Sequence, residues 1–220
     1  GGIILNGDCA RLAGLPGDYA VLAKILGPLM DAQLPLHLTM GNHDNRAPFY
    51  DVFSPLRPNE PPLPDKIVSV LEAPRANWYF LDSLDQVNVT PGKIGKAQLD
   101  WLTFALDARP EKPAIIICHH NLQVGGGTHG VLDTAALMDI LRPRKQVKAY
   151  LFGHQHRWGT AQDASGIHLV NLPAVAYVFN KKQPSGWLRA HTEPNRLRLE
   201  MRALDRSHKA HGQVVALDYR

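Results

Sequence analysis

Four short motifs in this chain carry side chains that can bind metals or transfer protons. In chain order they are Gly7-Asp8, Gly41-Asn42-His43-Asp44, Cys118-His119-His120 and Gly153-His154-Gln155-His156. Together they supply carboxylate, carboxamide and imidazole groups. This mixture of hard oxygen and borderline nitrogen donors suits zinc, iron, manganese or cobalt better than a purely soft or purely hard metal. The motifs therefore predict a transition-metal site.

Each motif directly follows an apolar run that is typical of a β-strand, at residues 3–5, 36–40, 114–117 and 149–152. Ligands of α/β sheets gather where strands end, so we expect the four motifs to meet at one rim. Taken singly, each motif can also be a turn, a helix cap or a core-edge histidine. In Gly-His-x-His, we expect the two histidines to bind two different metals only where the chain turns.

The motif series resembles that of the calcineurin-like metallophosphoesterase superfamily, which runs Asp-x-His, Gly-Asp, Gly-Asn-His-Asp or Glu, His, and Gly-His-x-His. Four of these five blocks are present, between Gly7 and His156. Residues 41–53 and 95–102 look like the branch of class III cyclic nucleotide phosphodiesterases and glycerophosphodiesterases. The resemblance implies an α/β fold, a four-layered αββα sandwich of two mixed sheets.

The Asp-x-His block is the one that this sequence does not contain. In the family it lies on a strand and helix that precede the Gly-Asp strand. We therefore expect residues 1–220 to form a single domain that lacks its first strand and helix, and a second metal position with fewer ligands.

The resemblance also implies a ligand set for two divalent or trivalent ions, with manganese, iron or zinc expected. One ion takes Asp8, Asn42, His119 and His154, and the other takes Asp8 and His156. Two such ions about 3.5–4 Å apart hold phosphoryl oxygens and generate a hydroxide nucleophile. His119 is chosen as the ligand because the family usually uses the first histidine of the pair.

Other residues near these ligands are candidates for proton transfer and substrate binding. The resemblance implies that His43 protonates the leaving alkoxide and that Asp44 orients it through the other ring nitrogen, or else caps a helix. Arg46 either pairs with a phosphate oxygen or forms a surface salt bridge. His120 and His129 are candidate substrate-binding residues, His129 because it lies in a glycine-rich loop.

The predicted function is hydrolysis of phosphodiesters. Two alternatives stay open: a phosphomonoesterase of the same fold, and a binding or scaffold module that has lost a metal site. The net charge of +4 suits a small anionic phosphate ester, and without a dense basic run we do not expect nucleic acid as a partner. No apolar run is long enough to span a bilayer. A homodimer, and a cytoplasmic or an exported location, are all compatible with the sequence.

Helices are expected at 18–32, with Asp18 as N-cap and Pro28 bending or ending it, and at 96–108 and 134–141. Strands are expected at 67–70 and 78–81, and only strands beyond His156, at 166–172, 187–191, 196–204 and 213–219. Tyr19, Asn171 and Tyr177 are further candidates for a substrate pocket.

Overall fold

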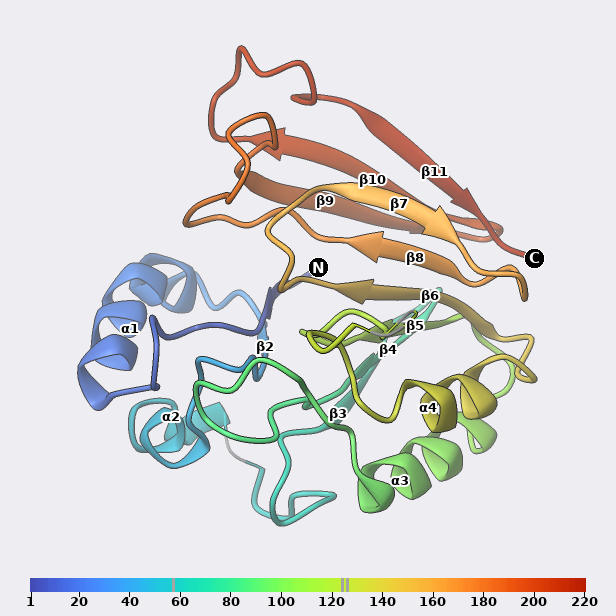
Figure 1. Cartoon of the computed structure of the whole chain (residues 1–220), viewed down its shortest axis with the longest axis horizontal. Coiled ribbons are helices and arrows are strands. Elements are labelled where there is room, and N and C mark those ends of the chain that lie inside the picture. Colours follow the sequence, from blue (N-terminus) through green and yellow to red (C-terminus); the bar gives the residue numbers. More distant parts are fainter. Residues whose placement is uncertain (57, 124, 126) are drawn as a thin grey trace.

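A computed structural model describes residues 1–56, 58–123, 125 and 127–220 of the chain (Figure 1). Its helices are α1 (Pro16–Asp31), α2 (Arg46–Val52), the short 3-10 helix η1 (Ser54–Leu56), α3 (Lys96–Asp107) and α4 (Thr134–Leu141). Its strands are β1 (Ile3–Asn6), β2 (Leu36–Thr39), β3 (Ser69–Glu72), β4 (Asn77–Phe80), β5 (Ala114–Ile117), β6 (Val147–Phe152), β7 (Gly159–Gln162), β8 (His168–Asn171), β9 (Gly186–Glu193), β10 (Arg196–Ala203) and β11 (Val214–Asp218).

The largest sheet has the strand order β3-β4-β5-β6-β8-β7, and its central pairs β4–β5, β5–β6 and β6–β8 are parallel. Its four-residue strand β5 reads Ala-Ile-Ile-Ile and is buried throughout, as expected for a parallel strand covered on both faces. One face packs on α3 and α4 through Leu102, Leu106 and Leu137. This sheet and its two helices make two layers of the molecule.

The opposite face of the large sheet packs against β9, β10 and β11, which form an antiparallel sheet. Alternation explains this contact, because Leu197 and Leu199 on β10 point inward while Arg196 and Arg198 point outward. Strands β1 and β2 form a separate parallel pair, and α1 and α2 pack on it around Tyr19 and Phe49. Figure 1 shows α1 and α2 on the side of the molecule away from α3 and α4. The predicted αββα layering is confirmed.

Most predicted elements agree with the structure, and the differences have local causes. Helix α4 has the predicted bounds, and α3 ends one residue earlier. Helix α1 begins at Pro16, so Asp18 is not the N-cap; its carboxylate accepts the N–H of Leu15 from within the first turn. Pro28 lies inside this helix, which continues to Asp31. Strand β7 was not predicted, because its Gly-Thr-Ala-Gln sequence has no apolar face.

Within the described part of the chain, none of the helices combines the length and the apolar character that crossing a bilayer requires.

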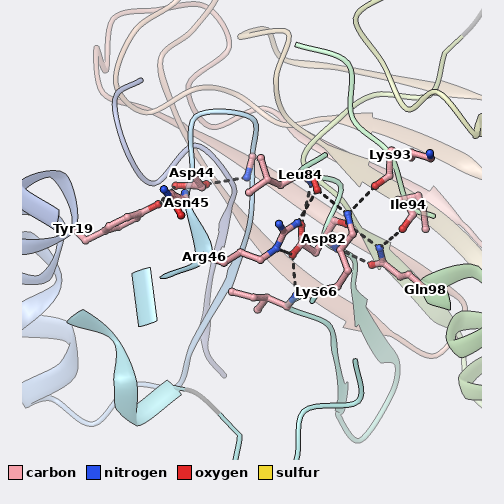
Figure 2. A network of polar contacts seen from close by, with 12 residues as sticks. Tyr19, Asp44, Asn45, Arg46, Lys66, Asp82, Leu84, Lys93, Ile94 and Gln98 are labelled. Carbon is pink, nitrogen blue, oxygen red and sulfur yellow. Dashed lines mark hydrogen bonds and ion pairs between the residues drawn. The ribbon is translucent and has the colours of Figure 1, made fainter. Parts of the chain in front are cut away.

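A buried ion pair fixes the loop after β4 to the start of α2 (Figure 2). Arg46 donates from Nε and Nη2 to the two carboxylate oxygens of Asp82, at 2.7 and 2.8 Å, and also to Leu84 O. Asp82 is fully buried and accepts two further bonds, from the N–H groups of Ile67 and Leu84. Arg46 is therefore held in an internal salt bridge, which corrects both the expected phosphate contact and the alternative of a surface pair.

Two more side chains in Figure 2 complete this network. The ammonium group of Lys66 donates to the carbonyls of Asp82, Leu84 and Lys93. Gln98 accepts the N–H of Asp82 and donates to its carbonyl. The network thus anchors both ends of the segment 84–93, whose Asn88 N–H donates to Asn42 O at 2.6 Å.

We predict that Arg46→Met lowers the free energy of unfolding by about 3 kcal/mol, because it leaves the buried Asp82 carboxylate without its cation. Urea denaturation followed by circular dichroism measures the loss. Arg144→Met is the matched control: Arg144 forms the same two-bond contact with Asp107, but that carboxylate is 57% exposed. An equal loss of unfolding free energy in the two variants would show that the buried Asp82 network contributes no more to stability than an exposed ion pair does.

Candidate metal centre

The turn after β1 carries Asp8 into the centre of the molecule, and two glycines make room for it. Gly7 and Asp8 both have left-handed backbones, with φ of 71° and 47°. A Cβ atom on Gly7 would collide with the ring of His119, and one on Gly41 would collide with the carboxylate and N–H of Asp8. The glycines of the first two motifs are therefore required by the close approach of three segments.

The carboxylate of Asp44 holds two of these segments together. It is fully buried and accepts the N–H groups of Cys9, Ala10 and Gly41 at 3.2, 3.0 and 2.8 Å, and the hydroxyl of Tyr19 at 3.2 Å. Burial raises the pKa of Asp44 to about 6, although the Gly41 N–H opposes that shift. Asp44 therefore positions the backbone on either side of Asp8.

The ring of His43 has a different partner, since its Nδ1 lies 2.9 Å from Leu12 O. The expected contact from Asp44 to this ring is therefore wrong, and so is the helix-cap alternative, because Asn45 is the N-cap of α2. A carbonyl only accepts, so Nδ1 must carry the proton and Nε2 is left for substrate or solvent.

His119 follows β5 and faces Asp8. Its Nδ1 donates to Asn6 O at 2.9 Å, and its Nε2 lies 3.2 Å from Asp8 Oδ2. Burial alone would raise the pKa of Asp8, but His119 and the N–H of His43 together hold it well below its usual value. Against the effect of burial, Asp8 in turn raises the pKa of His119, so a metal that binds the ionised carboxylate and Nε2 of this ring would displace a proton.

His119, His120 and His154 form a compact cluster, with metal-binding atoms within 4.8 Å of one another. The backbone of His154 and His156 is left-handed, with φ of 62° and 51°, so the chain turns at Gly-His-x-His as required. Burial lowers the pKa of His154 to about 4, with a contribution from His119. The ring of His154 is therefore neutral at physiological pH, as a ligand must be.

His120 was expected to contact substrate, and this is corrected. Its side chain is fully buried beneath the pocket, with Nδ1 2.7 Å from Ser83 Oγ. Its ring centroid lies 4.6 Å from that of His154. The sequence showed only two adjacent histidines and could not distinguish a ring directed into the pocket from one directed into the core.

Three buried atoms at this centre have no hydrogen-bond partner among the described residues: Asn42 Oδ1, His119 Nε2 and His120 Nε2. Buried polar atoms are rarely left in this state in folded proteins, because an unmade bond costs about 1–3 kcal/mol. All three are oxygen or nitrogen lone-pair donors of the kind that transition metals bind. The residues therefore fit a metal ion.

A pocket of about 500 Å³ opens directly above the centre. Of the predicted site residues, it brings together Asp8, Asn42, His43, His129, His154 and His156, whereas Asp44, Arg46, His119 and His120 are absent from its described lining. Tyr177 also lines it; Tyr19 is buried against Asp44, and Asn171 is buried beside Gln155. The lining residues that the motifs did not indicate are Thr90, Asn121, Gln155 and Phe179.

Known proteins that are similar to this chain include cyclic nucleotide phosphodiesterases. The chain is 27% identical over 182 residues to the 3',5'-cyclic adenosine monophosphate phosphodiesterase CpdA of Haemophilus influenzae, covering 80% of this chain and 62% of that one. It is 30% identical over 162 residues to CpdA of Pseudomonas aeruginosa, covering 70% and 54%. The chain thus spans less than two thirds of the length of these relatives.

The fold is also similar to that of a dimetal phosphatase from Danio rerio, with a TM-score of 0.70 at 14% identity, covering 93% of this chain and 79% of that one. The profile of the calcineurin-like phosphoesterases matches residues 3–158, which include all four motifs and every side chain of the centre. On that match, the chain belongs to the calcineurin-like phosphoesterase family.

Proposed function

We propose that this chain hydrolyses phosphodiesters at a metal centre, with His43 as the proton donor. The first metal position would be held by Asp8, Asn42, His119 and His154, and a second by Asp8 and His156. When bound, such ions supply Lewis-acid stabilisation of the phosphoryl charge and a nucleophile at neutral pH. The preference for His119 over His120 is supported by its convergence with Asp8 at 3.2 Å.

The observation that carries the preference for diesters is the charge of the pocket. No lysine or arginine occurs among its described lining residues, which offer one carboxylate, four histidines and several uncharged side chains. A phosphomonoester carries close to two negative charges at neutral pH, and binding it is commonly assisted by arginine or lysine. A diester carries only one. The lining therefore favours the diester over the monoester.

His43 is suited to protonating a leaving alkoxide. It lines the pocket, and its backbone N–H donates to Asp8 Oδ1 at 3.1 Å. The hydrogen bond from its ring Nδ1 to Leu12 O fixes the orientation of the ring. Protonated His43 would present Nε2–H to the leaving oxygen. Because the backbone of His43 is hydrogen-bonded to Asp8, the carboxylate that would hold the metal, the distance from the proton donor to a metal-bound phosphoryl group would be fixed.

We expect the protein to hydrolyse bis-p-nitrophenyl phosphate faster than p-nitrophenyl phosphate when assayed with manganese. Asp8→Ala should abolish turnover of both, because it removes the carboxylate shared by the two metal positions. Initial rates at matched metal loading give the comparison. A monoester preference would reject the charge argument, and full activity of Asp8→Ala would reject the centre itself.

A second expectation concerns metal binding without turnover. Manganese or zinc should raise the melting temperature of the wild-type protein by several degrees, because a ligand bound only by the folded state stabilises it. Asn42→Ala and His154→Ala should lose most of this shift. His191→Ala, an exposed histidine on β9, should retain it. Retention of the full shift in Asn42→Ala and His154→Ala would remove both from the ligand set.

His43→Ala should separate the proton donor from the ligands. We expect it to keep its bound metal, measured by elemental analysis, while turnover falls by about 10²–10⁴-fold for diesters with poor leaving groups. Diesters with p-nitrophenolate leaving groups, which need little protonation, should lose much less. Loss of metal together with activity would instead make His43 a ligand.

A further inference from the structure

One wall of the pocket is aromatic, and the proposed hydrolysis does not use it. Tyr177 and Phe179 come from the segment between β8 and β9 and line the pocket beside His156. Their side chains are 55% and 72% exposed, whereas Tyr79, Tyr150 and Phe80 of the central sheet are fully buried. These two rings therefore contribute little to the core, although exposing them to water is unfavourable.

The aromatic wall is held in place by His156. Phe179 stacks on the His156 ring with a centroid distance of 4.3 Å and an interplanar angle of 17°. Tyr177 meets both rings edge-on, and its carbonyl lies 3.0 Å from His156 Nδ1. Since one face of Phe179 is covered by His156 and the ring is still 72% exposed, its other face is open. A flat group could stack there without rearranging the wall.

The other residues that line the pocket indicate which kind of flat group could bind there. The lining also includes the hydroxyl of Thr90 and the amide side chains of Asn121 and Gln155, and the pocket volume of about 500 Å³ lies in the usual range for small ligands. A group that stacks on an aromatic ring and forms hydrogen bonds along its edge is a nucleobase. A glycerol or amino-alcohol group would leave Phe179 without a partner.

We propose that Tyr177 and Phe179 are specificity-determining residues that bind the nucleobase of a nucleoside phosphodiester. This inference rests on the proposed function, because it assumes that the phosphate of the same molecule lies at the metal centre. It adds two residues that recognise one of the two ester groups of the substrate, a role that the polar residues of the centre do not fill.

The test compares two diesters with alkoxide leaving groups, 3',5'-cyclic AMP with a base and glycerophosphoethanolamine without one. For the wild-type protein we expect a higher kcat/KM with the nucleotide. In Phe179→Ala, the ratio of the two kcat/KM values should fall about tenfold or more, mainly through KM for the nucleotide. Phe179→Trp should restore the ratio. Phe104→Ala, which removes an equally exposed ring on α3, should leave the ratio unchanged.

Metal content must be measured in each variant, because Phe179 touches His156. An equal loss on both substrates, or an unchanged ratio in Phe179→Ala, would overturn the subsite. So would wild-type turnover of glycerophosphoethanolamine without turnover of the nucleotide, which would leave the proposed hydrolysis standing.

If the wild-type protein hydrolysed neither these diesters nor bis-p-nitrophenyl phosphate, the proposed function would fail. Whenever the nucleotide is not turned over, calorimetric binding of 3',5'-cyclic AMP tests the subsite separately. Binding that weakens about tenfold in Phe179→Ala and recovers in Phe179→Trp would support it. Absence of binding, or equal binding to all three proteins, would reject it.

Discussion

The geometry of the candidate metal centre depends on one buried carboxylate, that of Asp44. Its four hydrogen bonds come from Cys9, Ala10, Gly41 and Tyr19, which belong to the turn after β1, the turn after β2 and helix α1. Desolvating a carboxylate is costly, and several donors at once are needed to offset that cost. Three of those donors are backbone N–H groups close to Asp8 and Asn42 in the sequence. The hydrogen bonds to Asp44 therefore also fix the distance between these two candidate ligands. An aspartate without direct contact to the pocket thus determines how the pocket is built.

The centre itself is unfavourable for folding. Asn42 Oδ1, His119 Nε2 and His120 Nε2 are buried without partners in the described structure, and the rings of His119, His120 and His154 pack against one another. The surrounding elements compensate for this cost. The parallel strands β5 and β6 are almost wholly buried on both faces, and the Asp82 network fixes the segment that meets Asn42. Preorganising ligands in this way is useful only if something binds them, because otherwise the same volume filled with apolar side chains would be more stable.

Much of this arrangement could be predicted from the sequence because the signals are local. The apolar run at β5, the helix at 134–141 and the alternating strand β10 follow from periodicity, and the order of the motifs led to the family and the layering. The partners of Arg46, Asp44 and His120 could not be predicted, since each depends on residues from other segments: Asp82, Cys9 and Ser83. Phe179 was missed for a related reason, as an isolated aromatic residue in a loop has no pattern, and only the ring of His156 gives it a fixed place.

The distribution of positive charge connects the network to the chemistry. Arg46 and Lys66 both belong to the Asp82 network: Arg46 donates to the Asp82 carboxylate and to Leu84 O, and the Lys66 ammonium group donates to three backbone carbonyls. Burial lowers the pKa of Lys66, and the charge of Asp82 opposes that shift. The lining residues that the structure describes include no lysine or arginine. If the chain hydrolyses phosphodiesters as proposed, affinity for the anionic substrate would come from bound metal and from His43, so substrate binding and metal loading would be linked. The aromatic wall and the uncharged polar side chains of the lining would then distinguish one phosphodiester from another.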